Sequence, residues 1–182
     1  NGVLPDDLVV KHVQQVPSDF HARHSSVGKR YRYLICNLPY RSPFSRNKSW
    51  WVQKSLNLEA IREASSYLIG KYDFSAFRAA TCSSPNPNKD LREILCDVKP
   101  WLHANLCFEL EADSFLQHMV RIMVGTLVQV GIGKLKPEQM KGILESCDRT
   151  QAGLTAPAHG LYALAVRYPE DRIEWPIELM DS

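Results

Sequence analysis

One arginine lies in the middle of a long apolar segment, SFLQHMVRIMVGTLVQVG, which spans residues 114–131. At the helical period of about 100° per residue, Arg121 shares a narrow polar stripe with His118 and Gln129, while apolar side chains occupy the rest of the cylinder. We therefore predict a helix that is wrapped by the core and looks outward only along this stripe. A guanidinium does not lose its proton and is costly to bury without an anion. The pattern indicates that Arg121 binds an anion, which is either a structural carboxylate or part of a site.

A tyrosine between basic residues is the second chemical feature. In KRYRYLIC, residues 29–36, the alternation of a strand places Tyr31 and the neighbouring arginines on opposite faces. A strand tyrosine usually packs against a neighbour, which is the structural alternative here. Together with Arg121, however, Tyr31 would supply an aromatic plane beside a fixed cation, an arrangement that suits a flipped nucleobase.

The basic residues are distributed very unevenly. No Asp or Glu occurs in residues 20–58, whereas that segment carries eight lysines and arginines and the whole chain has a net charge of only +2. Aromatic residues alternate with these charges and offer surfaces on which bases stack. We interpret the segment as a surface that binds phosphate and nucleic acid; the alternative is a solvated basic face without a partner.

Several classes of site are not indicated. The five cysteines show no CxxC spacing, His21 and His24 have no neighbouring cysteine or carboxylate ligands, and there is no glycine-rich phosphate loop or nucleophile elbow. We predict no metal site and, from the unpaired cysteines inside apolar runs, a reducing compartment. Neither a membrane span nor a signal peptide is indicated.

The periodicities predict the elements that position these residues. Strands are expected at residues 8–16, 29–36, 50–52, 91–99, 106–112 and 161–168, with a connection at residues 100–105. Helices are expected from the cap Asn57 to Gly70, from the cap Ser114 through residue 131, and over residues 137–147, with loops at residues 79–90 and 149–159. This order favours an α+β fold with a mostly antiparallel sheet and helices packed on one face. We expect one domain over residues 1–168 and an irregular tail over residues 169–182.

Five motifs in order resemble those of the TruA-type tRNA pseudouridine synthases: LPDDLVV, DFHARHSSVGKRYRYLI, DFSAF, FLQHMVRIMVGTLVQVG and TAPAHGLYALAVRYP. The likeness runs nearly from end to end and corresponds to the larger, C-terminal part of such an enzyme. It implies the pseudouridine synthase fold. It also implies isomerisation of uridine to pseudouridine in the anticodon arm of tRNA, without metal or organic cofactor.

The resemblance assigns roles to individual residues. Tyr31 matches the tyrosine that stacks on the target base and assists proton removal, and Arg121 matches the basic residue that pairs with a catalytic aspartate. Leu161 and Leu164 lie in the motif that forms the apolar walls of the uracil pocket. Further residues are predicted to contact RNA: Arg23, His24, Lys29, Arg30, Arg78 and His118.

The catalytic aspartate itself has no counterpart in this sequence. The family carries it in a Gly-Arg-Thr-Asp motif of a smaller N-terminal domain, and no such tetrad occurs here. We therefore expect the chain to be inactive alone and to require that domain, with tRNA as substrate; family members commonly form homodimers. The compartment would be cytoplasm, nucleus or organelle, and the protein is not expected to be secreted. A stand-alone RNA-binding module without catalysis is the alternative function.

Overall fold

The computed structural model describes residues 1–101 and 104–169, which divide into two compact units. The larger unit, Val27–Arg167, contains every helix and strand among the described residues. The smaller unit consists of Asn1–Ser26 and the segment that begins at Tyr168. Within it, the Tyr168 hydroxyl donates a hydrogen bond to the Ala22 carbonyl at 2.7 Å, and the Phe20 and Tyr168 rings are 5.1 Å apart.

The sheet is built around one strand, β1 (Gly28–Cys36). On one side β1 pairs antiparallel with β5 (Ala104–Ala112). Strand β5 pairs with β4 (Asn88–Trp101), and β4 pairs with β3 (Gly70–Asp73). On its other side β1 pairs antiparallel with β6 (Leu161–Arg167) and, at its last two residues, parallel with β2 (Trp50–Trp51). Only the short β2 pairing is parallel within the described residues, so the prediction of a mostly antiparallel sheet is confirmed.

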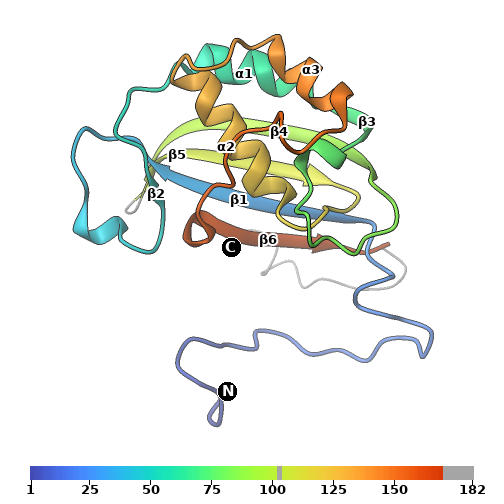
Figure 1. Ribbon diagram of the computed structural model, residues 1–182. Helices are drawn as coiled ribbons and strands as arrows, with labels where there is room; N and C mark the ends of the chain where they lie inside the picture. The colour runs from blue at the N-terminus through green and yellow to red at the C-terminus, as the bar shows by residue number, and fades with distance from the viewer. Residues whose placement is uncertain (102–103, 170–182) are drawn as a thin grey trace. The chain divides into compact units, whose positions relative to one another are not determined.

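Three helices cover one face of this sheet (Figure 1): α1 (Leu58–Ser66), α2 (Met119–Gly131) and α3 (Gln139–Ser146). Three short 3-10 turns complete the unit: η1 (Pro43–Ser45), η2 (Ser75–Phe77) and η3 (Ala158–Gly160). Asn57 caps α1 as predicted, because its side-chain oxygen accepts the Ala60 N–H at 3.1 Å. The predicted α+β fold is therefore confirmed. No helix in the described ranges has the length and apolarity that a membrane span requires.

The core lies between the helices and the sheet. Tyr33, Phe108 and Met123 are fully buried there, and they come from β1, β5 and α2. Helix α2 is buried on nearly all sides because its sequence is apolar all round.

The polar stripe, to which Gly125 also belongs at the helical period, is partly covered as well: Arg121 and Gln129 are half-buried and Gly125 is buried. An added Cβ at Gly125 would stand 1.9 Å from the Leu154 carbonyl oxygen. The expectation that the whole stripe looks outward was wrong, because the chain following α3 packs directly on it.

The opposite face of the sheet carries a layer of ion pairs. Glu109, which is 8% exposed, accepts hydrogen bonds from Arg30 at 2.8 Å and from Arg32 at 2.6 Å. Arg30 also lies 3.3 Å from Glu111 and 3.2 Å from Glu93. Burial alone would raise the pKa of the Glu109 carboxyl, but the hydrogen bonds and charges of the two arginines outweigh burial and lower the pKa. Arg30 and Arg32 are thus held by acids from neighbouring strands.

One predicted strand and two predicted helix boundaries were wrong. Residues 8–16 form no strand; Val9 and Val13 are exposed, and no strand partner for them exists among the described residues. The helix with Arg121 begins at Met119 rather than after Ser114, because His118 has a left-handed backbone and the Asp113 carboxylate accepts the N–H groups of Asp90 and Ser114. Helix α1 ends at Ser66, before Gly70.

Other boundaries agree within a few residues, and the predicted tail cannot be compared. Strands β4 and β5 replace the expected pair at 91–99 and 106–112, and α3 lies inside the expected 137–147. Strand β4 starts at Asn88, so the loop predicted over residues 79–90 is slightly shorter. Apart from Pro169, the tail predicted over residues 169–182 lies outside the described residues.

The ion-pair layer generates a prediction about stability. Glu109→Gln removes the carboxylate shared by two largely buried guanidinium groups, so we expect a loss of about 2–3 kcal/mol in the free energy of unfolding at pH 7. Because the folded-state pKa of Glu109 is lowered, its contribution is present above the unfolded pKa of about 4.3 and is lost as pH falls further. Urea unfolding between pH 7 and pH 3 should therefore show a flatter acid limb for the variant.

Glu93→Gln is the matched control, since Glu93 contacts the same Arg30 but its side chain is 42% exposed. We expect this change to cost less than about 1 kcal/mol. Equal losses for the two variants would contradict a special role of Glu109.

Candidate active site

A cavity of about 310 Å³ opens where the start of α2 meets the first half of β1. Its walls come from β1, from the segment before α2, from α2 itself and from the turn η3 with the start of β6. The lining residues are Tyr31, Phe115, Leu116, Gln117, His118, Met119, Val120, Arg121, Ala158 and Leu161. Tyr31 and Arg121, which are 90 positions apart in the sequence, thus line one cavity as the sequence predicted.

Tyr31 lies on the helix-covered face of β1, opposite Arg30 and Arg32. The Phe115 ring meets the Tyr31 ring edge-on, with centroids 5.3 Å apart and an interplanar angle of 90°. Such an edge contact holds the orientation of the Tyr31 ring and leaves a face for another flat group. Among the described residues, no group forms a hydrogen bond with the Tyr31 hydroxyl.

Arg121, in the first turn of α2, is held by a single residue. Its Nε donates to the Ala156 carbonyl oxygen at 2.7 Å, and its own carbonyl accepts the Ala156 N–H at 3.0 Å. No carboxylate in residues 1–101 or 104–169 forms a salt bridge with this guanidinium. A neutral carbonyl orients the group without cancelling its charge, so the half-buried cation remains able to bind an anion.

The segment that holds Arg121 is itself fixed by close packing. The Tyr33 hydroxyl donates to the Pro157 carbonyl at 2.6 Å, and an added Cβ at Gly160 would lie 2.8 Å from the Tyr33 ring. Burial raises the pKa of the Tyr33 phenol, although the positive charge of Arg121 opposes this effect. Tyr33 therefore stays protonated and donates its hydrogen bond to Pro157, which fixes the segment directly before η3 and β6.

The two leucines predicted to form apolar walls have different positions. Leu161 lines the cavity, but Leu164 does not. Leu164 is the extra residue of a β-bulge, because Ala163 pairs with Tyr31 while Ala165 pairs with Arg30, and it is 40% exposed. A bulge depends on pairing between distant strands, so the alternation of β6 alone did not reveal it.

His118 lines the cavity, but it precedes the helix rather than lying on it. Its backbone is left-handed, with φ of 62°, which separates the extended segment from α2. The neighbouring Phe115 and Gln117 also line the cavity, and sequence reasoning missed both. Their position in the motif around Arg121 was the available signal, which the assumption of a longer helix obscured.

The remaining predicted RNA contacts are spread over the chain. Arg78 donates to the Cys82 carbonyl at 2.8 Å and does not line the cavity, although the adjacent Ala79 N–H bonds to the Gln117 carbonyl at 3.0 Å. Lys29 shares the face of Tyr31 at the start of β1, whereas Arg30 lies in the ion-pair layer on the other face. Arg23 and His24 belong to the smaller unit.

The structure brings together no metal-binding cluster within its described ranges. No group of three or more His, Cys, Asp and Glu side chains there is arranged to hold a metal ion. The cavity is lined by the aromatic rings of Tyr31 and Phe115, the guanidinium of Arg121, the polar side chains of Gln117 and His118, and apolar side chains.

Comparisons with known proteins identify close relatives. A sequence model of the family described as tRNA pseudouridine synthase matches residues 64–169. The chain is 44% identical to tRNA pseudouridine synthase A of a Thermoanaerobacter species over 168 residues, which cover 92% of this chain and 68% of the relative. It is 43% identical to the tRNA pseudouridine synthase A of Acetivibrio thermocellus over the same shares. The corresponding protein of Thermus thermophilus is 41% identical over 95% of this chain and 68% of the relative.

The packing of the segment around Leu154 on α2 can be tested at one glycine. Gly125→Ala places a methyl group against the Leu154 backbone, so the segment that holds Arg121 must move. We expect a loss of about 1–3 kcal/mol in the free energy of unfolding, measured by chemical denaturation.

Gly142→Ala is the matched control in α3, where nothing lies within 4 Å of the added Cβ. Alanine is favoured over glycine inside a helix, so this variant should gain about 0.5–1 kcal/mol. A Gly125→Ala variant as stable as the wild type would show that the segment around Leu154 does not pack on α2 as described.

Proposed function

Since this chain belongs to the tRNA pseudouridine synthase family, we propose that it binds tRNA and isomerises uridine to pseudouridine in the cavity between Tyr31 and Arg121. The observation that carries this proposal is the guanidinium of Arg121. It lines the cavity, is oriented by its hydrogen bond to Ala156, and has no acidic partner among the described residues. We also propose, as the family resemblance implies, that the target lies in the anticodon arm and that no metal or organic cofactor takes part.

The cavity suits a pyrimidine ring. Its volume of about 310 Å³ is at the lower end of the range for small-molecule sites. In the proposed complex the uracil leaves its base stack, lies against the Tyr31 ring and contacts the apolar side chains of Ala158 and Leu161. These side chains exclude water from the base, and flipping gives the enzyme access to both of the base atoms that must react.

Arg121 would hold the nucleophile. We propose that an aspartate from a segment outside this chain enters the cavity and pairs with the guanidinium. An apolar pocket raises the pKa of a carboxyl group, whereas an adjacent guanidinium lowers it, so the pair keeps the aspartate ionised and correctly aimed. The rigid Nε bond to Ala156 would fix the direction of that pair.

The reaction balances without an external reagent. The carboxylate promotes cleavage of the bond between ribose C1′ and uracil N1, the base turns, and C1′ then bonds to uracil C5. The proton on C5 is lost and N1 gains one, so the product is an isomer of the substrate. Tyr31, whose hydroxyl is otherwise unpartnered among the described residues, is the residue we assign to assist removal of the C5 proton.

The need for an external aspartate gives the first functional prediction. This chain alone should release no tritium from tRNA labelled at uracil C5, because it contains no counterpart of the family's aspartate motif. Supplying the aspartate-bearing domain, on the same chain or separately, should restore release.

Turnover by the isolated chain would disprove the proposed division of catalytic groups. If the isolated chain binds tRNA but the complete protein still forms no pseudouridine, the stand-alone RNA-binding alternative would replace the enzymatic proposal. Sedimentation of the complete protein would determine whether it forms the homodimer that is common in the family.

The role of Arg121 gives the second functional prediction. In the complete enzyme, Arg121→Met keeps similar bulk but removes the charge that orients the aspartate, so kcat should fall by about 10²–10³-fold while KM for tRNA changes much less.

Arg62→Met is the matched control for Arg121. Arg62 also donates to a backbone carbonyl, that of Cys96 at 3.0 Å, but it lies on α1 and does not line the cavity. We expect its kcat to match the wild type. Equal kcat in the Arg121 variant and the control would rule out the proposed ion pair.

A further inference from the structure

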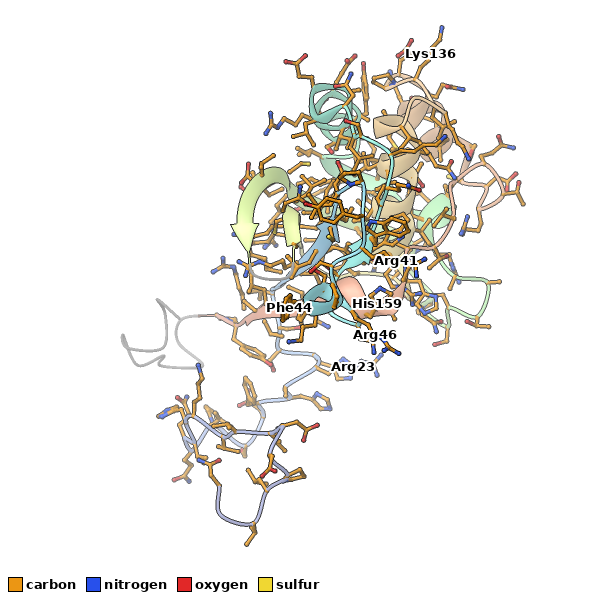
Figure 2. All side chains as sticks on the ribbon, turned by 90° about the vertical axis from the view of Figure 1, so that its left-hand side faces the viewer. Arg23, Arg41, Phe44, Arg46, Lys136 and His159 are labelled. Carbon is orange, nitrogen blue, oxygen red and sulfur yellow. The ribbon has the colours of Figure 1, made fainter. Side chains whose placement is uncertain are left out.

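A second, larger cavity lies at the other end of β1. Its volume is about 490 Å³, and it is enclosed by the loop that leads from β1 through η1 to β2. The lining residues are Cys36, Arg41, Ser42, Pro43, Ser45, Arg46, Asn47, Ser49, Trp50, Trp51 and His159. The basic side chains Arg41, Arg46 and His159 belong to this lining, which contains no acidic residue. Figure 2 shows these three side chains on the same side of the molecule, with Phe44 beside them.

The aromatic residues of this cavity are held in place. The Trp51 indole N–H donates to the Leu38 carbonyl at 2.9 Å, and the Arg41 guanidinium lies over the Trp51 ring at 4.6 Å from its centroid. The Trp50 ring contacts the Tyr33 ring edge-on at 6.4 Å. A guanidinium stacked on an indole loses mobility but keeps its N–H edge, which is the edge that binds phosphate.

One turn forms a wall of both cavities. Ala158 lines the cavity of Tyr31 and Arg121, and the next residue, His159, lines the larger cavity. The turn is rigid because Gly160 packs closely on Tyr33, whose hydroxyl binds Pro157. The two cavities therefore meet at neighbouring residues of this turn, Ala158 and His159.

The loop itself also exposes aromatic surface. Tyr40 and Phe44 are 69% and 74% exposed, and they flank Arg41. Exposed rings next to arginines are typical of surfaces that bind single-stranded nucleic acid, where bases stack and phosphates contact the cations. The absence of any Asp or Glu in residues 20–58 leaves this positive potential uncompensated within the segment.

We propose that this second cavity binds a nucleotide next to the target uridine, with its phosphate held by Arg41, Arg46 and His159 and its base against the exposed rings. The inference rests on the proposed function, because it assumes that the uracil enters the Tyr31 cavity. It assigns to this loop a role in holding the RNA strand rather than in the chemical step. Arg41 and Arg46 are then determinants of KM rather than of kcat.

The experiment uses the complete enzyme and an unmodified tRNA transcript that the wild type converts. Arg41→Ala/Arg46→Ala should raise KM and Kd by about 10–100-fold, leave kcat within about twofold, and flatten the dependence of log Kd on log salt by about one for each lost phosphate contact. Lys136→Ala is the matched control, since this exposed lysine lies far from the second cavity in Figure 2. It should change neither quantity.

A second measurement locates the phosphate. In tRNA assembled with one neutral methylphosphonate linkage on either side of the target uridine, one position should weaken wild-type binding about tenfold. The same linkage should have no further effect on the double variant, because the contact is already lost. Arg46→Ala alone provides the same test if the double variant fails to fold, since the side chain of Arg41 also contacts Trp51.

The outcomes separate this inference from the proposed function. If the wild-type enzyme converts none of the tRNA transcripts tested, the proposed function is refuted. Normal turnover with a double variant whose KM and salt dependence equal those of the Lys136 control would refute the second cavity alone. If the double variant binds tRNA normally but loses self-association in sedimentation, the loop contacts another copy of the chain and the inference is wrong.

Discussion

The double hydrogen bond between Arg121 and Ala156 is the interaction on which the site depends. It connects the first turn of α2 to the chain that enters β6, two segments that are more than thirty residues apart. Because the Pro157 carbonyl of the segment before β6 also accepts a hydrogen bond from Tyr33 of β1, this segment, helix α2 and the sheet are held together around one cavity. Gly125 permits this arrangement, since only a residue without a side chain lets the Leu154 backbone approach the helix so closely.

Strand β1 separates two uses of positive charge. Its alternation places Arg30 and Arg32 against Glu109 on one face and Tyr31 in the cavity on the other. The basic segment seen in the sequence is therefore not one continuous surface. Part of its charge is neutralised by acids from β4 and β5, and part, in the loop from β1 to β2, faces a cavity without acids.

Local patterns predicted more of the fold than of the site. The alternation of β1, the pair of β4 and β5, and the Asn57 cap depend on nearby residues, so the sequence was sufficient for them. The partner of Arg30 is 79 positions away and the bulge at Leu164 depends on the pairing of β6 with β1, so neither could be derived from local spacing. The valines of residues 8–16 gave a prediction that was wrong, because alternating residues form a strand only where a neighbouring strand pairs with them.

A cation held by a neutral group can be half-buried in a stable fold before an anion binds to it. The bond from Arg121 Nε to the Ala156 carbonyl satisfies one donor of the guanidinium before any anion arrives, which reduces the cost of its partial burial. The net charge remains, and its attraction for a carboxylate is stronger in a half-buried pocket than in water. In the proposed enzyme, arrival of the aspartate would therefore both neutralise Arg121 and position the nucleophile, so that docking of the second segment and assembly of the catalytic pair become one event.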